Sequence, residues 1–462
     1  MLVFLLGRPL FTPAAGVASA AAYALLSLGS DVYGTQAHAT HFLIAAALGA
    51  TLLLLRGRPL PLFLSCLLYG VAILMKQHAV FFALFGALYI FFFHWRQFRK
   101  LALFLLGTSA PLAITALALW RAGVFERFWF WTVTYAREYA LALSLSEGLA
   151  LFKFTFPEVV GPNLLLWFLA CAGLALLWWR KPDRASAVFA TAFLVFSCLA
   201  VSPGLYFRGH YFVLLLPAIA LLAGATVSST RKLTWLLFGA ILAVSIAWQS
   251  EFLFRVSPLQ ASHWMYSNAP FPEGIEIGDY LRTHSAPDAR IAVLGSEPEI
   301  YFYAHRRSAT GYIYTYGMME SQPFALTMQN EMIHDIETTR PEYIVFVQRA
   351  PILVAPARFA IQNPGLVECL RRAKLHPGRS RRYATHRPLP SRLPLGQFGH
   401  LPPRQPPLYS HPEEEPVTQN RLPPPPLTVK LLSTHPCQPH VVNPSPSPRP
   451  PIPNPISTMP SG

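Results

Sequence analysis

The 462-residue chain is 53% hydrophobic, only 13% charged, and has a formal net charge of +15. So few charges in so apolar a chain fit a membrane protein that carries a soluble part. The positive charge does not indicate a nucleic-acid partner, because it lies in short loops and in residues 351–462. There, 13 Lys and Arg minus 4 Glu give a net of +9.

Nine apolar stretches follow one another before residue 251. A bilayer is crossed by about 20 apolar residues at 1.5 Å of rise per residue, with about 17–25 seen in practice. The low charge disfavours the alternative, in which these are buried helices of a large soluble protein. We therefore expect a polytopic α-helical bundle with spans at 9–29, 39–55, 59–75, 78–93, 101–120, 162–179, 186–203, 210–227 and 233–250.

The loops between these stretches alternate in charge. Four are rich in Lys and Arg, namely 56–58, 96–100, 180–184 and 231–232. Basic loops mark the cytoplasmic side of a membrane. The sequence therefore predicts a multi-pass protein of an inner (plasma) membrane, with its amino end in the cytoplasm and residues 251 onward outside it.

Three regions follow from the composition. Residues 1–254 form the membrane bundle, and residues 255–350 are expected to form a small extracytoplasmic α/β domain. In the latter, 291–295 and 343–347 are typical of short buried strands, with helices predicted near 274–284 and at 321–339. The alternation of strands and helices favours a sheet covered by helices.

Residues 351–462 form a basic, proline-rich tail, with 27 of the 44 prolines of the chain. Such a segment buries too little apolar surface to offset its ordering entropy, so disorder or polyproline II is expected. It is either a proline-rich binding tail or, as we favour, the product of a frameshift in GC-rich DNA. The other reading frames of the gene would decide between the two.

Polar side chains gather in the loops expected outside the membrane. Ionisable groups at or near a span are costly and merit a functional hypothesis. If the turns are adjacent, cations there would converge at the depth of lipid headgroups, where they stabilise phosphate. The phosphate-binding candidates are Lys76, Arg208 and His210, and the further outer-face candidates are His38, His41, Gln77, Tyr135 and Arg137.

Each candidate has an alternative interpretation. Lys76 and Arg208 could simply extend to the membrane interface. His38 and His41 could share a helix face and bind a metal, but without a third ligand loop capping is favoured. Residues 128–131, Phe-Trp-Phe-Trp, are typical of an aromatic belt in an interfacial helix.

Two acids in the expected soluble domain, Glu297 and Glu299, follow the first predicted strand. They could form a site. Acids are also favoured at helix amino ends by the helix dipole, and we prefer that interpretation.

Several segments resemble one family when taken in chain order. They are Gly34 to Phe42, Gly70 to Gln77, Phe128 to Tyr139, His210 to Pro217 and Ile291 to Tyr312. In order and topology, residues 1–348 resemble the bacterial membrane glycosyltransferases of the C-type superfamily. That group contains protein O-mannosyltransferases, aminoarabinose transferases and Rgt-like enzymes.

The resemblance implies an inverting transfer of a sugar at the outer face of the membrane. The donor would be a polyprenyl-phosphate-linked sugar, and the acceptor a lipid, glycan or protein. Lys76 and Arg208 would stabilise the leaving phosphate. A divalent cation stays open as a cofactor.

The sequence departs from the family at its amino end. The family places a general-base carboxylate in the first outer loop, where it activates the acceptor hydroxyl. We find no such acidic loop ahead of residue 9, so the chain is expected to be a fragment that lacks the amino-terminal part, and it could be inactive. Asp31 is the weak candidate base among the remaining loops, and it lies outside the family's motif.

Two other functions compete with sugar transfer. A transporter or flippase of lipid-linked sugars would need polar groups at mid-membrane and often broken helices in repeated halves. A non-catalytic membrane scaffold would bind a partner through its outer domain.

Overall fold

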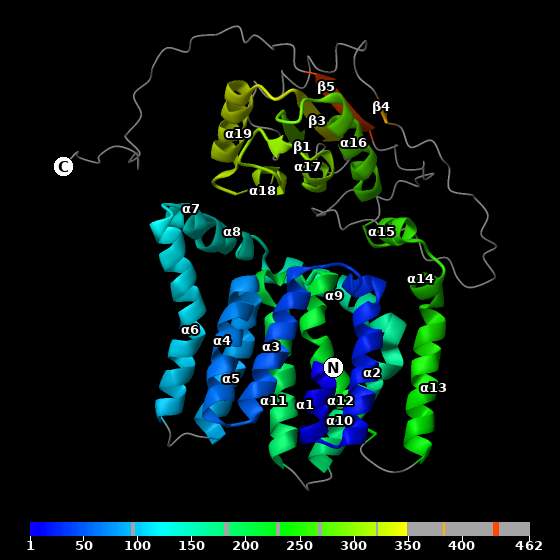
Figure 1. The fold of residues 1–462 in the computed structure, drawn as a ribbon. Helices are drawn as coiled ribbons and strands as arrows, with labels where there is room; N and C mark the ends of the chain where they lie inside the picture. Colours follow the sequence, from blue (N-terminus) through cyan, green and yellow to red (C-terminus); the bar gives the residue numbers. More distant parts are fainter. Residues whose placement is uncertain are drawn as a thin grey trace. The chain divides into compact units, whose positions relative to one another are not determined.

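The computed structural model describes residues 1–93, 98–179, 184–227, 232–266, 270–319 and 322–348, and the backbone of two strands at 382–383 and 428–433. These residues are mostly helical (Figure 1). They fall into two compact units, the first ending at Pro272 and the second beginning at Glu273.

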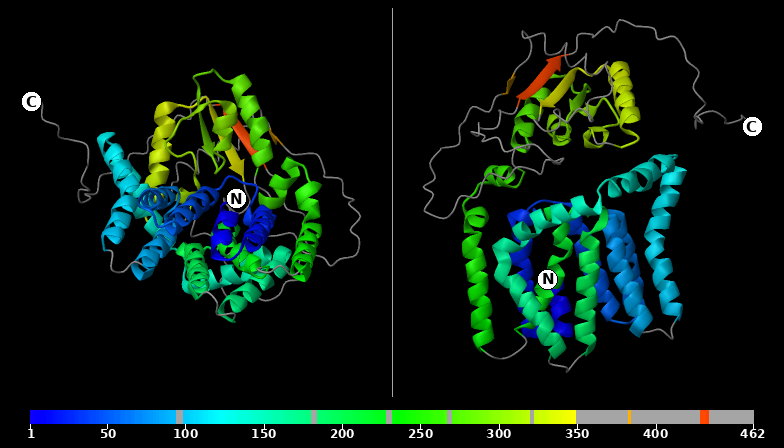
Figure 2. Two further views of the ribbon diagram at one scale, coloured as in Figure 1. Left: turned by 60° about the horizontal axis from the view of Figure 1, so that its bottom comes forward. Right: turned by 180° about the vertical axis from the view of Figure 1, so that it is seen from behind.

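The first unit is a bundle of apolar helices joined by short turns (Figures 1 and 2). Its helices are α1 (Leu2–Leu10), α2 (Pro13–Leu28), α3 (Ala39–Leu55), α4 (Pro59–Met75), α5 (Val80–Phe93), α6 (Phe98–Arg121), α7 (Phe125–Trp129), α8 (Tyr135–Ala140), α9 (Leu145–Val160), α10 (Leu164–Trp179), α11 (Arg184–Val201), α12 (Leu216–Ala225), α13 (Lys232–Trp248), α14 (Ser250–Phe254) and α15 (Pro258–Tyr266).

Three helical stretches in the described ranges are long and apolar enough to cross a membrane: Phe98–Arg121, Leu145–Trp179 and Arg184–Val201. The second of these joins α9 to α10 through the 3-10 turn η4 (Gly161–Asn163). The chain is thus compatible with a membrane protein. Six shorter apolar helices accompany the three: Pro13–Leu28, Ala39–Leu55, Pro59–Met75, Gln77–Phe92, Leu216–Ala225 and Lys232–Trp248.

The stretch expected as one span at 9–29 is interrupted near its start. α1 ends at Leu10, with Pro9 in its last turn. The Thr12 side chain accepts a hydrogen bond from the Ala15 amide at 3.1 Å, and Pro13 follows as the first residue of α2. A capping residue followed by proline is a strong signal for a new helix, and the sequence prediction missed it.

The stretch expected as one span at 210–227 is also broken. Its first residues form the 3-10 helix η6 (Gly209–Leu214), and α12 begins only at Leu216. Pro217 accounts for the break, because a proline disfavours helical geometry in the residue before it and suits the first turn of a new helix. The α-helical part is therefore shorter than the sequence predicts.

Small residues bring the helices of the bundle close together. A Cβ placed on Gly173 of α10 would lie 1.8 Å from the carbonyl oxygen of Leu222 in α12, so only glycine fits there. All ten residues of α12 are buried. α12 is therefore the central helix of the unit.

A short aromatic segment runs across one end of the bundle (Figures 1 and 2). It consists of α7, a π-helical turn η3 (Phe130–Thr134) and α8. Residues 128–131, expected as an aromatic belt in an interfacial helix, are thus helical, but they cross from α7 into the wider π-helical turn.

The second unit contains short strands and helices. Strand β1 (Arg290–Leu294) pairs in parallel with β2 (Arg307–Ser308) and β3 (Tyr343–Gln348). With β4 (Arg382–Tyr383) and β5 (Thr428–Ser433), the sheet order is β2-β1-β3-β5-β4. Its helices are α16 (Phe271–His284), α17 (Glu299–Ala304), α18 (Tyr316–Met319) and α19 (Ala325–Thr339). Ile291 and Val293 of β1 and Val345 of β3 are fully buried among Ile277, Leu281 and Ile300.

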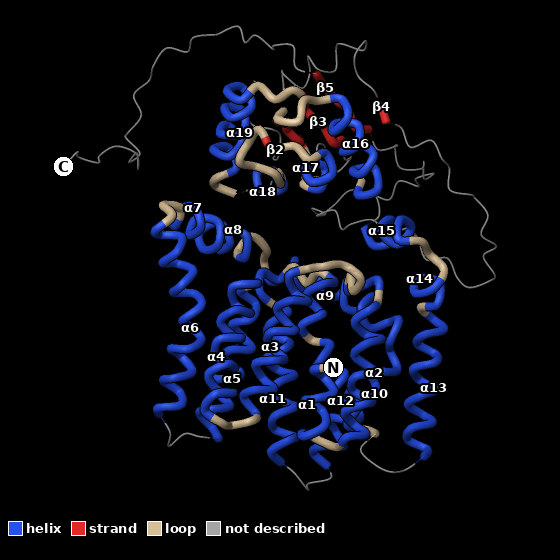
Figure 3. The backbone as a smooth tube through the Cα atoms, viewed as in Figure 1, coloured by secondary structure: helices blue, strands red, loops and turns tan. Residues whose placement is uncertain are grey.

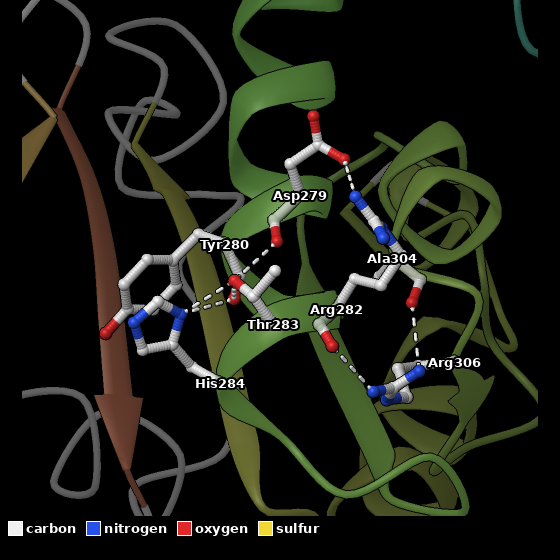
Figure 4. Close-up of polar contacts among 7 residues, drawn as sticks. All are labelled: Asp279, Tyr280, Arg282, Thr283, His284, Ala304 and Arg306. Carbon is white, nitrogen blue, oxygen red and sulfur yellow. Dashed lines mark hydrogen bonds and ion pairs between the residues drawn. The ribbon is translucent and has the colours of Figure 1, made fainter.

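Arg306 holds two helix ends of this unit together (Figure 4). Its guanidinium donates to the carbonyl oxygens of Arg282 at 2.9 Å, Ser285 at 2.8 Å and Ala304 at 3.2 Å. These are carbonyls at the carboxyl ends of α16 and α17, where a cation also meets the negative end of the helix dipole. Arg306 is therefore a capping residue of the fold.

Of the proline-rich tail, only two strands are described. β4 (Arg382–Tyr383) pairs antiparallel with β5 (Thr428–Ser433), and β5 pairs antiparallel with β3. The segment 428–433 contains Val429, Leu431 and Leu432 and no proline, in an otherwise proline-rich sequence. The expectation of disorder or polyproline II for the rest of 351–462 lies outside the described residues.

Candidate functional site

Polar turns of the first unit meet at one end of the bundle, which we call the loop end (Figure 3). The carbonyl oxygen of Asp31 lies 2.0 Å from where a Cβ would stand on Gly209, so these two turns touch through their backbones. The side-chain amide of Gln77 donates to the carbonyl of Thr132 at 3.1 Å. The turn between α4 and α5 is thereby joined to the aromatic segment α7–η3–α8.

Two histidines from different turns lie face to face at the loop end. The rings of His38 and His210 are stacked, with centroids 4.4 Å apart and planes 6° from parallel. Tyr33 stands edge-on to both, at 5.8 Å and 6.0 Å. Tyr266, the last residue of α15, places its hydroxyl 3.0 Å from His38 Nε2. The sequence separation of 228 residues across this last contact means that the site is assembled by the fold.

Lys76 supplies the central charge of this region. Its Nζ lies 4.0 Å from the centre of the Tyr211 ring, a cation–π contact. Burial, together with the nearby Arg208, lowers the pKa of Lys76 to about 8. Among the described residues, no acidic side chain forms an ion pair with Lys76. An ammonium held in this way lacks the anion that would stabilise its charge.

Arg208 approaches the same region from an exposed position. Its guanidinium lies over the Tyr206 ring at 5.2 Å, and Tyr206 in turn stacks on Tyr139 of α8 at 4.5 Å. Lys76, Arg208 and His38 all act electrostatically on His210. We call these four residues, His38, Lys76, Arg208 and His210, the basic cluster.

Burial and the neighbouring His41 and Lys76 hold the pKa of His38 below its usual value. His38 is therefore neutral near pH 7, and Lys76 and Arg208 provide the positive charge of the basic cluster. Neutral imidazoles donate and accept hydrogen bonds, and so complement a bound anion without adding charge.

Unusual backbone geometry shapes the turns that hold the cluster. Tyr33, Leu205 and Phe207 have left-handed φ values of 55°, 58° and 43°, which are uncommon for residues with a side chain. Such strain persists only where the surrounding structure enforces it, and it is concentrated at functional sites. Gly34 is required by packing, because a Cβ there would lie 1.8 Å from the Ser27 carbonyl oxygen.

The remaining sequence candidates are placed apart from the basic cluster or act only at its edge. Gln77 is turned toward Thr132, and His41 Nε2 is buried without a hydrogen-bond partner among the described residues. Tyr135 packs edge-on against Trp131 at 5.3 Å, and Arg137 is exposed on α8. Asp31 lies beside Ser30, whose hydroxyl is 3.4 Å from its Oδ2.

Three tyrosines of the site were not anticipated from the sequence: Tyr33, Tyr206 and Tyr266. Tyr33 and Tyr206 flank the predicted turns, so an aromatic beside a basic turn was an available signal. Tyr266 lies far from these turns in the sequence, and no local pattern points to it.

His, Cys, Asp and Glu side chains are the possible metal ligands in the ranges that the structure describes. Within those ranges, no three or more His, Cys, Asp or Glu side chains are grouped to hold a metal ion. The pair His38 and His41 gains no third ligand of that kind there. Two cations, two imidazoles and nearby phenols are instead suited to an oxyanion such as phosphate.

The two acids of the second unit, Glu297 and Glu299, lie close enough to interact electrostatically. Glu297 is 3% exposed, and Glu299 opens α17. Burial and the charge of Glu297 raise the pKa of Glu299 to about 7. Glu299 does occupy the first turn of a helix, as the preferred sequence interpretation has it.

No protein-family model matches this chain, and no curated protein matches it.

Proposed function

We propose that this protein is an integral membrane glycosyltransferase. It moves a sugar from a polyprenyl-phosphate-linked donor to a lipid, glycan or protein outside the cytoplasm. In this proposal the three long apolar stretches and the six shorter apolar helices make up nine spans. In this proposal the second unit is a small extracytoplasmic α/β domain, and the lipid phosphate binds at the outer face of the membrane.

The observation that carries this proposal is the basic cluster. Lys76 is partly buried and has no acidic ion-pair partner among the described residues, and Arg208 and two stacked imidazoles lie nearby. Such an arrangement is costly to fold unless an anion binds there. A lipid phosphate is an anion that a membrane protein meets at the ends of its helices.

In this reaction, an acceptor hydroxyl attacks the anomeric carbon of the donor sugar. The bond between that carbon and the phosphate oxygen breaks, and negative charge develops on the leaving lipid phosphate. Lys76 and Arg208 stabilise that charge and so lower the free energy of the transition state. A base takes the proton of the hydroxyl, and Asp31, which contacts Gly209 through its backbone, is the candidate carboxylate of the first turn.

One observation favours a second function. The expected span at 210–227 is broken into η6 and α12 directly after Arg208. Broken helices beside charged groups are typical of transporters. A carrier that moves lipid-linked sugars across the membrane is therefore the alternative.

The two functions are separated by reconstituting the full chain into liposomes with polyprenyl-phosphate-linked sugars and glycan acceptors. If Asp31 serves as the base, the unaltered chain transfers the sugar, and Lys76→Met should reduce this transfer by about 100–1000-fold, as for removal of one oxyanion-stabilising group. Lys153→Met, which changes an exposed lysine of α9, is the matched control and should have no effect. Movement of the lipid without sugar transfer would favour the carrier, and full activity of Lys76→Met would remove Lys76 from the site.

A further inference from the structure

A shallow open pocket lies on one face of the aromatic segment α7–η3–α8. It has a volume of about 420 Å³ and is lined by Phe125, Glu126, Trp129, Phe130 and Thr134. Most of this lining is aromatic carbon. The pocket is therefore suited to a hydrocarbon group and not to a charged one.

The backbone contributes to the shape of this face. Residues 130–134 form a π-helical turn, a rare geometry that recurs at functional sites. Trp129 and Trp131 are 50% and 43% exposed. Both indole side chains are thus partly exposed in the part of the chain that the structure describes.

The same segment is attached to the basic cluster at two points. Thr132 accepts the hydrogen bond from Gln77, the residue after Lys76. Tyr139 stacks on Tyr206, over which Arg208 lies. From Phe125 to Tyr139 a helix would extend about 20 Å at 1.5 Å per residue. A long lipid chain whose phosphate lies on the cluster easily spans that distance.

We propose that this pocket binds the isoprenoid tail of the carrier lipid whose phosphate occupies the basic cluster. The inference rests on the proposed function and adds the location of the tail. Charge supports this orientation, because Glu126 in the pocket lining repels a phosphate and Lys76 attracts one. A single-chain lipid also needs only one such pocket for its tail.

The test measures binding of three lipids to the full chain in detergent micelles. They are a long-chain polyisoprenyl phosphate, the short geranyl phosphate, and a diacyl phosphatidic acid. Trp129→Ala removes the largest side chain of the pocket, and Trp129→Phe is the conservative variant. Trp120→Ala on α6 is the matched control, because Trp120 is 67% exposed and does not line the pocket.

Trp129→Ala should weaken binding of the long-chain phosphate about tenfold and leave geranyl phosphate unchanged. Trp129→Phe should restore most of the affinity, and Trp120→Ala should bind as the unaltered chain does. Lys76→Met should weaken the binding of both isoprenyl phosphates, because it removes the positive charge that binds their phosphate and leaves the pocket for the tail intact.

Three results would overturn the inference. Equal losses of affinity for the long and the short isoprenyl phosphate in Trp129→Ala would mean that the pocket does not bind the tail. An equal loss for phosphatidic acid would assign the pocket to phospholipid acyl chains. If the unaltered chain bound neither isoprenyl phosphate, the proposed function would fail as well, and this outcome differs from a failure confined to the Trp129 variants.

Discussion

His38 and His210 lie with their imidazole rings stacked at a centroid distance of 4.4 Å, although 171 positions separate them in the sequence (210 − 38 − 1 = 171). The stack joins the turn before α3 to the turn before α12. The stack forms only when the two turns lie together, so measuring the pKa of His38 shows whether the loop end is assembled.

His38→Gln should make the protein less sensitive to acid. The pKa of folded His38 lies below its ordinary value of 6.5 because of burial, His41 and Lys76. Unfolded His38 thus binds a proton more readily, and stability is lost as the pH falls from above 6.5 toward the folded pKa. The melting temperature of the unaltered protein should fall between pH 7.5 and 5.5, and that of His38→Gln should fall less. Equal slopes would contradict the buried, neutral imidazole.

Lys76→Met should raise stability while lowering phosphate binding. The pKa of Lys76 is lowered to about 8, so its charged form is disfavoured in the folded state at pH 7. Removing the charge should therefore raise the melting temperature by a few degrees. A residue kept only for stability would give the opposite change.

Phosphate binding should weaken as the pH rises through about 8, because Lys76 then loses its proton. Lys76→Arg keeps its charge at this pH and should bind with no such decline. Titrating the affinity for a polyisoprenyl phosphate between pH 6.5 and 9.5 measures this. An alkaline decline of the same size in Lys76→Arg would assign it to another group.

Gly209→Ala should disrupt the loop end. Its new Cβ would stand 2.0 Å from the Asp31 carbonyl oxygen, so one of two turns must move, at a cost of about 1–3 kcal/mol. Gly239→Ala is the control, because a Cβ there meets nothing within 4 Å, and alanine in a helix is favoured by about 0.5–1 kcal/mol. Denaturation in detergent should show that Gly209→Ala is less stable, and Gly239→Ala more stable, than the unaltered protein.

Tyr266→Phe should loosen α15 without unfolding the bundle. It removes the hydrogen bond to His38, worth about 0.5–1.5 kcal/mol, but keeps the ring beside Tyr33 at 5.2 Å. Hydrogen exchange of residues 258–266 should accelerate, while exchange in α12 stays unchanged. Equal acceleration in α12 would mean that Tyr266 supports the whole unit.

Glu299→Gln should stabilise the second unit near neutral pH. Burial and Glu297 raise the pKa of Glu299 to about 7 from 4.5. The folded state therefore holds this proton more tightly than the unfolded state, and stability is lost as the pH rises from 4.5 through 7. Exchange protection of β1 should be higher in Glu299→Gln than in the unaltered protein at pH 7.5 and equal at pH 4.5.

The sequence predicted several apolar helices and the first strand because apolar length and periodicity are local signals. The positions of α3, α4 and β1 follow from them within a residue or two. The 3-10 helix at Gly209–Leu214 was missed because the stretch from residue 211 onward is apolar, and hydropathy does not distinguish a 3-10 helix from an α-helix. Pro217 was the visible clue.

The candidate site was predicted only in its charges. Lys76, Arg208 and His210 were singled out because cations near a span are costly. The stacking of His38 on His210 and the contact of Tyr266 could not be predicted, since both depend on how distant turns fold together. Asp31 was named only as the carboxylate left in its turn, and its backbone contact with Gly209 was not anticipated.

The most direct test of the central claim is chemical labelling of Lys76 with a membrane-impermeant amine reagent in oriented vesicles. A pKa of about 8 makes this amine reactive near neutral pH. We predict labelling of Lys76 only from the extracytoplasmic side, and protection by a long-chain polyisoprenyl phosphate. Labelling only from the cytoplasmic side, or equal labelling with and without the lipid, would contradict a lipid-phosphate site at the outer face.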